Sequence, residues 1–393
     1  MLTSTSAYAR PLFRLLLIIT LAAVVVLGTA VPAAAGGAET PAARGSAPVR
    51  GGPVLTSPKS YAKHYVDLAR TIGGAIQATR RGDTIHAAYY LFDLRRTSDQ
   101  LIAAHRRGVR VKLVVARPSS PRTATARQLA RLARVLGTDR RGLSYVFSPA
   151  SSGLSKAPSA NLHAKVITFS RAGPQRYISF VGSGNLNYNN TVRAWNETQT
   201  IVGDRKIYRA LARYVEAIAK DEARPHYYRK VRSNGLTLHL FPGAPDIIGR
   251  ALKKAKPGGS CSLIVATFMW ADNRLAEARK VARLARRGCR VRVLVNATPE
   301  LFGARVAATL RSARVPVRNL QVRHRGLDGY LHTKTWIING TVYAGSANSS
   351  PRTRRMNADV LTVRTSKNAT GRAHLAAYQG FLDRMWSLGR PTS

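Results

Sequence analysis

The feature that most constrains this 393-residue chain is that its second half repeats the pattern of its first. In the first half, residues 84–91 and 109–116 flank a basic segment that ends at Gly108. In the second half, residues 263–270 and 289–296 flank a basic segment that ends at Gly288. Short apolar runs that bracket an amphipathic basic segment predict strand–helix–strand units with right-handed crossovers. The chain therefore predicts an α/β fold of two similar lobes.

The rest of each half continues the repetition. An irregular stretch, another strand and a Gly-Ser turn lead to a closing helix, predicted near residues 204–220 and again near residues 372–388. The polar stretch 221–235 is predicted to connect the halves. We expect lobes at residues 54–225 and 236–390, each a mixed β-sheet flanked by helices, related by a pseudo-twofold axis. In such a duplicated chain, any catalytic motif should occur twice.

One motif does occur twice, at corresponding places in the two halves. Its members are His163, Lys165, Gly182, Ser183 and Asn185 in the first half, and His332, Lys334, Gly345, Ser346 and Asn348 in the second. Residues two apart on a strand share a face, so each histidine should project beside its lysine. A single His-x-Lys is weak evidence for a site. The same set repeated in both halves is specific.

The paired residues match the needs of attack on a phosphodiester. That reaction requires a nucleophile, a proton donor for the leaving oxygen and positive charge around the other phosphate oxygens. Two imidazoles, two ammonium groups and two amides supply these groups, and we expect no metal or other cofactor. The glycine of each Gly-Ser turn has no Cβ, so we expect the backbone there to approach an anion closely.

These motifs resemble those of the phospholipase D superfamily, and the resemblance covers nearly all of the chain after residue 53. It implies that the two motifs form one site with a phosphohistidine intermediate. By position, His163 would be the nucleophile and His332 the acid and base, although the reverse assignment stays open. The resemblance further implies that Lys165, Lys334, Asn185 and Asn348 hold phosphate oxygens and that Gly182, Ser183, Gly345 and Ser346 line the substrate site.

The same resemblance implies a carboxylate downstream of each motif that orients the imidazole of the opposite half. Glu197 and Asp359 stand at the matching places. A carboxylate on one ring nitrogen fixes the tautomer and stabilises the protonated ring.

The chain departs from the family pattern at the aspartate that follows each His-x-Lys. Ser170 stands in its place in the first half and Asn339 in the second. One interpretation is that this position only bonds nearby structure, so that another hydrogen-bonding residue replaces it. The other is that the double loss marks a protein that binds phosphodiesters without cleaving them.

The first 35 residues have the pattern of an export signal. Arg10 and Arg14 precede an apolar run over residues 15–31, and the small residues Ala33 and Ala35 predict cleavage after Ala35. The protein is therefore expected to be secreted, with an uncleaved membrane anchor as the alternative. Residues 36–53, rich in Gly, Ala and Pro, are predicted to be a flexible linker.

The chain has two cysteines, Cys261 and Cys289. Outside the cytoplasm such a pair favours a disulfide, and the sulfurs would meet if the two strands that begin beside them are parallel neighbours. Two buried free thiols are the alternative.

The net charge of +45, from 63 Lys and Arg against 18 Asp and Glu, predicts attraction to polyanions. Three functions follow. A secreted phospholipase acting on a phospholipid at an anionic membrane surface is favoured, because exported chains with both motifs resemble bacterial phospholipases D. A metal-independent nuclease is the second, and a silent binder of anionic polymers the third. We expect a monomer, since one chain carries both motifs.

Overall fold

The computed structural model describes residues 48–60, 66–324 and 327–392. The predicted signal segment and most of the predicted linker lie outside these residues. The linker's last two residues, Gly52 and Pro53, already belong to strand β1. Within the described ranges, no helix combines the length and apolar character needed to cross a bilayer.

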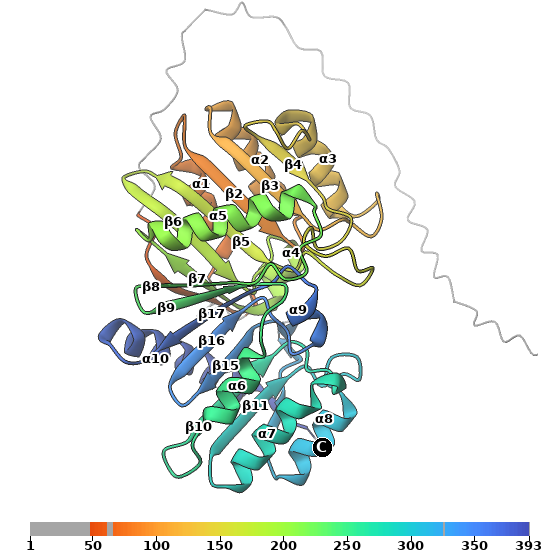
Figure 1. The fold of residues 1–393 in the computed structure, drawn as a ribbon, viewed down its shortest axis with the longest axis vertical. Helices are drawn as coiled ribbons and strands as arrows, with labels where there is room; N and C mark the ends of the chain where they lie inside the picture. The colour runs from red at the N-terminus through yellow and green to blue at the C-terminus, as the bar shows by residue number, and fades with distance from the viewer. Residues whose placement is uncertain (1–47, 61–65, 325–326, 393) are drawn as a thin grey trace, which may run out of the picture. The chain divides into compact units, whose positions relative to one another are not determined.

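The elements follow the predicted duplication (Figure 1). The first half contains β1 (Gly52–Thr56), α1 (Leu68–Gln77), β2 (Thr84–Tyr89), α2 (Arg95–Arg106), β3 (Arg110–Val115), α3 (Ala124–Leu136), β4 (Tyr145–Phe147), β5 (Lys165–Ala172), β6 (Gln175–Gly182), α4 (Tyr188–Arg193), β7 (Ala194–Ile201) and α5 (Arg205–Lys220). The second half contains β8 (Arg229–Ser233), β9 (Leu236–Leu240), α6 (Ile247–Lys254), β10 (Ser262–Thr267), η2 (Asp272–Arg274), α7 (Leu275–Arg286), β11 (Arg290–Val295), α8 (Ala304–Ser312), β12 (Val317–Asn319), β13 (Val322–His324), β14 (Leu327–Leu331), β15 (Lys334–Ile338), β16 (Thr341–Gly345), α9 (Pro351–Arg355), β17 (Val360–Thr365), α10 (Ala369–Leu388) and β18 (Arg390–Pro391).

Two sheets carry the same strand order. The first sheet contains the run β4-β3-β2-β5-β6-β7 and the second contains β12-β11-β10-β15-β16-β17. In each, the two strands of the predicted crossover unit are parallel neighbours, β2 with β3 and β10 with β11. The next strand along the chain pairs antiparallel to the first, β5 with β2 and β15 with β10. The predicted α/β fold of two similar lobes with mixed sheets is confirmed.

The first sheet includes a strand from the second half at its edge. Strand β14 comes from the second half, yet it pairs parallel to β7 of the first sheet through Tyr330–Ala194 and Leu331–Trp195. Beyond β17, the second sheet is extended by β9 and then β8. Strand β8 lies inside the stretch predicted to be a connection, so that stretch is partly sheet edge.

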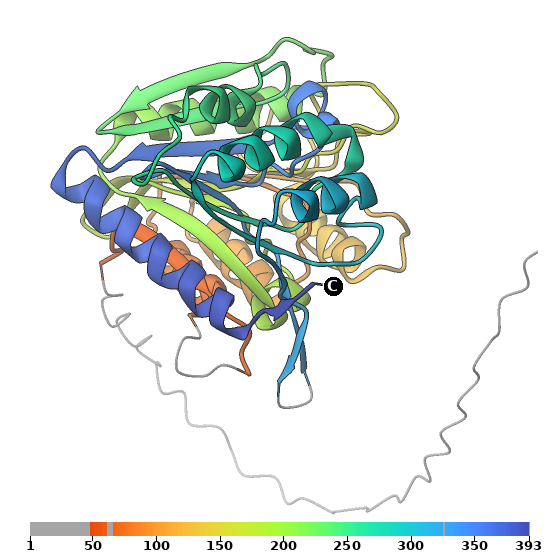
Figure 2. The ribbon, with the colours of Figure 1, turned by 90° about the horizontal axis from the view of Figure 1, so that it is seen from below.

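Apolar faces of the helices cover both sheets. Helix α5 begins after Asp204, whose side chain accepts a hydrogen bond from the Ile207 N–H at 3.0 Å, and its buried face packs on β2, β5 and β6. Helix α10 lies against β1, β16 and β17, and Figure 2 shows it running along one side of the molecule. Phe381 of α10 packs on Trp195 of β7 with ring centroids 5.8 Å apart. Helix α10 therefore contacts strands of both sheets.

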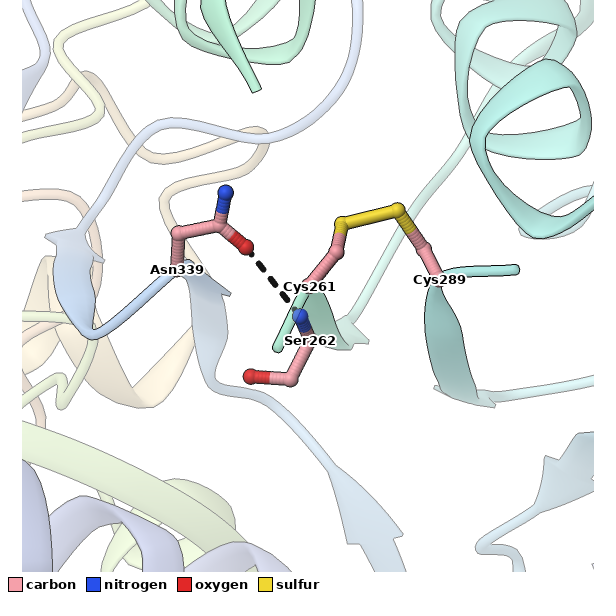
Figure 3. The surroundings of a disulfide bond; sticks show 4 residues. All are labelled: Cys261, Ser262, Cys289 and Asn339. Atoms are coloured by element: carbon pink, nitrogen blue, oxygen red, sulfur yellow. Dashed lines mark hydrogen bonds between the residues drawn. A yellow bond between two sulfur atoms is a disulfide. The ribbon is translucent and has the colours of Figure 1, made fainter. Parts of the chain in front are cut away.

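Cys261 and Cys289 form a disulfide, which resolves the alternative left open by the sequence (Figure 3). Each cysteine directly precedes a strand-opening residue, Ser262 of β10 and Arg290 of β11, and these two residues are register partners. The parallel pairing thus brings the Cα atoms of the cysteines to 4.7 Å.

Ser170 and Asn339, which replace the family aspartate, have structural tasks. The Ser170 Oγ accepts from the N–H of Thr84, the first residue of β2, at 2.8 Å. The Asn339 Oδ1 accepts from the N–H of Ser262, the first residue of β10, at 3.1 Å (Figure 3). Both residues therefore hold the start of the central strand, and both contacts favour the structural interpretation of the missing aspartate.

Candidate functional site

Strands β5 and β15 position the histidine–lysine pairs. Lys165 and Lys334 are the first residues of these strands, and each histidine lies two residues earlier. The backbone N–H of His163 donates to the carbonyl of Ala358, and that of His332 donates to the carbonyl of Trp195. Each pair is thus tied to the end of a strand that carries a predicted carboxylate of the opposite half. We call His163, Lys165 and Asn185 the first half-site, and His332, Lys334 and Asn348 the second half-site.

In the first half-site a carboxylate from the opposite half holds the imidazole. His163 Nδ1 lies 2.8 Å from Asp359 Oδ1. Because a carboxylate only accepts, Nδ1 carries the hydrogen and the lone pair of the neutral ring is on Nε2. Ser346 Oγ donates to the same carboxylate oxygen at 2.5 Å, and Asp359 is completely buried. The Tyr90 ring lies 5.1 Å from the imidazole, centroid to centroid.

In the second half-site the ring partner is an amide. His332 Nδ1 lies 2.8 Å from Asn196 Oδ1. Glu197 was expected to orient this imidazole, but its carboxylate instead accepts from Ser183 Oγ and Thr333 Oγ1, each at 2.5 Å. The expectation for Glu197 is therefore corrected.

A one-residue offset explains the difference. His163 donates its backbone N–H to the residue immediately before its carboxylate, Ala358. His332 donates to Trp195, which is two residues before Glu197. Because of this offset, Asn196 lies beside the His332 imidazole and Glu197 contacts the Thr333 hydroxyl. No pattern in the sequence marked Asn196 or Thr333, and only the adjacency of Asn196 to Glu197 gave a signal.

The lysines are buried beside both histidines. Lys165 Nζ donates to the His163 carbonyl at 2.5 Å, and Lys334 Nζ donates to the His332 carbonyl. The ammonium groups lie over aromatic rings, Lys165 at 5.2 Å from the Tyr90 centroid and Lys334 at 4.9 Å from that of Phe268. Neither ring was predicted as part of the site.

The charges of the two half-sites act on one another. Burial lowers the pKa of His163 to about 4 and that of Lys165 to about 7, while the Asp359 carboxylate opposes both shifts. Burial also lowers the pKa of His332 and of Lys334, and the charge of Lys165 adds to both shifts. The charge of His163 contributes to the shift of His332. The charges of each half-site therefore reach the titratable groups of the other.

The titratable groups of both half-sites are largely removed from water. Burial raises the pKa of Glu197 to about 7, although hydrogen bonds from Ser183 and Thr333 and the charge of Lys334 oppose the shift. A bound phosphate anion would raise the pKa of each lysine and histidine and so favour their protonated forms. The arrangement therefore suits a phosphate group better than a neutral ligand.

The Gly-Ser turns support the site from beneath. A Cβ on Gly182 would lie 2.2 Å from the Glu197 carbonyl oxygen, and one on Gly345 would lie 2.4 Å from that of Val360. The glycines are thus needed for close packing of β6 on β7 and of β16 on β17. Ser183 and Ser346 are fully buried and bond the carboxylates. These contacts give the four residues a structural role, and their place in a substrate-lining surface stays a prediction.

The two asparagines of the motif have different surroundings. Asn185 Oδ1 accepts from the Leu91 N–H at 3.1 Å, which leaves its amide hydrogens to face other groups. Asn348 Oδ1 has no hydrogen-bond partner among the described residues. The amide of Asn348 is therefore the less constrained of the two.

Residues 48–60, 66–324 and 327–392 contain no group of three or more His, Cys, Asp or Glu side chains placed to hold a metal ion.

Comparisons with known proteins agree with this geometry. A family model described as "Cardiolipin synthase, PLD-like domain" matches residues 74–219 and 248–386, one match for each half and together more than half of the chain. No curated protein matches the chain significantly.

Two solved structures share the fold. Phosphatidylserine synthase from Haemophilus influenzae Rd KW20 has a TM-score of 0.57 at 14% identity, over 86% of this chain and 87% of that one. Polyphosphate kinase from Porphyromonas gingivalis has a TM-score of 0.55 at 14% identity, over 84% of this chain, which spans only 47% of the kinase. With one family match in each half and the repeated strand order, the chain belongs to the phospholipase D superfamily, whose members process phosphodiesters.

Proposed function

We propose that this protein is a secreted phosphodiesterase that cleaves a phospholipid through a phosphohistidine intermediate. The observation that carries the proposal is the pair of imidazoles, partly buried in His163 and buried in His332, each with its Nδ1 bonded to the opposite half and each beside a buried lysine. This tautomer leaves Nε2 of each ring available, which supports attack by one ring and protonation by the other.

His163 acts as the nucleophile. Its Nε2 attacks phosphorus, the bond from phosphorus to the leaving alcohol oxygen breaks, and that oxygen takes the proton from His332 Nε2. The phosphorylated ring of His163 is formally positive, and the Asp359 carboxylate on Nδ1 offsets this charge. Lys165, Lys334, Asn185 and Asn348 stabilise the charge on the phosphate oxygens.

Water completes the cycle. His332 Nε2 removes a proton from water, the water oxygen attacks phosphorus, and the bond to His163 Nε2 breaks. A second alcohol in place of water would give transfer of the phosphatidyl group, so hydrolysis and transfer share these residues.

A phospholipid is favoured by exposed apolar side chains beside Asn185. Leu91, whose N–H bonds Asn185, is 36% exposed, and Tyr188 at the start of α4 is 62% exposed. Tyr89, Phe92 and Trp270, which lie at or just after the ends of β2 and β10, are core residues and do not contribute to such a surface. Export is supported by the disulfide, which persists in oxidising compartments, and by the N-terminal sequence pattern.

The net charge of +45 favours a second function, a nuclease that acts on a nucleic-acid backbone. Phosphatidylcholine vesicles and plasmid DNA, each with and without a chelator, separate the two. We expect release of choline from vesicles, no effect of the chelator, and no release by the His163→Ala variant. Nicked DNA with intact lipid would establish the nuclease instead. An inactive protein that still binds either polymer would indicate a silent binder.

A further inference from the structure

Asn196 stands where the repetition predicts a carboxylate. The corresponding place in the first half-site is taken by Asp359, which bonds His163. In the second half-site, Asn196 bonds His332 while Glu197 is engaged by Ser183 and Thr333. The two imidazoles therefore have partners of different charge.

The orientation of the Asn196 amide follows from its other contacts. Its Nδ2 donates to the carbonyl of Asn190 at 3.1 Å and to that of Ala194 at 3.4 Å. Because Nδ2 faces two acceptors, Oδ1 is the atom that faces His332 Nδ1. An amide oxygen only accepts, so Nδ1 of His332 carries the hydrogen and Nε2 is free to gain or lose a proton.

The support of Asn196 extends to the phosphate-binding side of the site. Asn190 of α4 accepts the Asn185 N–H on its side-chain oxygen at 2.8 Å, and its Nδ2 donates to the Tyr330 hydroxyl at 3.0 Å. Asn190 thus holds the backbone of Asn185 and, through its own carbonyl, the amide of Asn196. Asn196 is 2% exposed, so this amide is held within the protein interior.

We propose that Asn196 is a positioning residue that locks His332 in the Nδ1–H tautomer without adding negative charge, and thereby dedicates His332 to proton transfer while His163 forms the covalent bond. This inference rests on the proposed function.

The chemistry of the two steps explains the division. The phosphorylated ring of His163 stays charged for the lifetime of the intermediate, so a carboxylate partner is useful there. His332 must instead release a proton to the leaving alcohol and regain one from water in each turnover. An amide supports the ring in both states but cannot take the proton itself, whereas a carboxylate would hold the ring in its charged form.

The surroundings of His332 also favour the neutral form of its ring. Burial and the charges of Lys334, Lys165 and His163 lower its pKa, and the Ser183 carbonyl opposes them. The rings of Phe268 and Tyr330, at centroid distances of 5.0 Å and 6.1 Å, cover it. A carboxylate in place of the Asn196 amide would counter the lowering of the His332 pKa.

The test compares Asn196→Asp, Asn196→Ala and a control, Asn357→Ala. Asn357 is a buried asparagine before the carboxylate of the other half, and its Oδ1 holds the backbone N–H of Asn161 at 3.0 Å. Turnover of bis(4-nitrophenyl) phosphate and of phosphatidylcholine is followed against pH, and ¹⁵N-histidine NMR reports the tautomer and titration of each ring.

For Asn196→Asp we expect the limb of the pH–rate profile that belongs to His332 to move up by about one to three pH units. For Asn196→Ala we expect kcat to fall about 10- to 100-fold with little change in KM, and the NMR signal of the Nδ1–H tautomer to weaken. The Asn357→Ala control should leave the position of the limb unchanged.

Two outcomes would overturn the role of Asn196: an Nε2–H tautomer of His332 in active wild-type protein, or an Asn196→Asp profile that coincides with the wild type. An inactive wild-type protein whose His332 still shows the Nδ1–H tautomer would overturn the proposed function and not the positioning. The NMR measurement therefore separates the two failures.

Discussion

In the first half-site a carboxylate holds His163, whereas in the second an amide holds His332, although both half-sites have the same repeated sequence pattern. The backbone contacts differ by one residue, and that offset decides which side chain meets each ring. The comparison teaches that a duplicated motif conserves the place of a catalytic group more strictly than its electrostatic partner. Each prediction below tests one difference between the halves.

The largest difference is expected between His163→Ala and His332→Ala. Both should lower phospholipid turnover by roughly 10³-fold or more, because one removes the nucleophile and the other the proton donor. With bis(4-nitrophenyl) phosphate, whose leaving group needs no proton, only His332→Ala should still release a burst of one nitrophenolate per site. Stopped-flow absorbance measures the burst. A burst in His163→Ala and none in His332→Ala would reverse the two roles.

Removing the carboxylates should also have unequal effects. Asp359→Asn breaks the charge-assisted bond to His163 and should lower kcat about 10- to 100-fold. Glu197→Gln removes a charge near Lys334 but breaks no contact with either imidazole, so its effect should stay below about tenfold. Steady-state kinetics at one pH, with circular dichroism to verify folding, makes the comparison. Equal losses would argue against the assignment of Asp359 to His163.

The disulfide links strands β10 and β11 of the second sheet covalently. The corresponding positions before β2 and β3 of the first sheet are Asp83 and Val109, which form no such bond. Replacing both Cys261 and Cys289 with serine should lower the free energy of unfolding by about 3–4 kcal/mol, since the bond closes a loop with a sequence separation of 28. Urea unfolding with and without a reducing agent measures this. A wild-type protein insensitive to reduction, and equal in stability to the variant, would contradict the prediction.

Buried neutral histidines make the second half sensitive to acid. Burial lowers the pKa of His239 and of His374 to about 4, whereas an unfolded histidine titrates near 6.5. Between these values the unfolded chain binds more protons, so stability is full above pH 6.5 and is lost as the pH falls toward 4. Each histidine contributes about 1–3 kcal/mol to that loss. His374→Gln should flatten the loss between pH 7 and 4.5 in urea titrations, and an unchanged slope would refute this.

The smallest effects are expected at the two positions that replaced the family aspartate. Ser170→Ala and Asn339→Ala should each cost about 1 kcal/mol, because each leaves a strand-opening N–H without its side-chain acceptor. Asn339→Ala should cost more, since its φ of 46° is a left-handed conformation that asparagine tolerates better than alanine. Restoring aspartate at both should leave turnover unchanged. Loss of activity in the alanine or the aspartate variants would show that Ser170 and Asn339 contribute to catalysis.

Much of the fold was predictable because its signals are local. The apolar runs at 84–91 and 263–270 are strands β2 and β10, and the closing helices near 204–220 and 372–388 are α5 and α10. Repetition made the motif residues predictable as well. The pairing of His332 with Asn196 was not, because it depends on how β14 meets β7, two segments more than 130 residues apart.

The structural role of the Gly-Ser turns could not be predicted, for a related reason. A sequence shows that Gly182 and Gly345 lack a side chain but not what fills the space. In the structure, carbonyl groups of the neighbouring strands β7 and β17 lie there. A substrate-facing turn and a tightly packed strand end have the same residue pattern.

The pairing of β14 with β7 makes the two halves mutually dependent during biogenesis. A fragment that ended after α5 would keep β1 paired along most of β7, but it would lack β14 beside Ala194 and Trp195. Expressed as separate polypeptides, the two halves would have to meet before β14 could complete the first sheet. The continuous chain keeps them together while this contact forms.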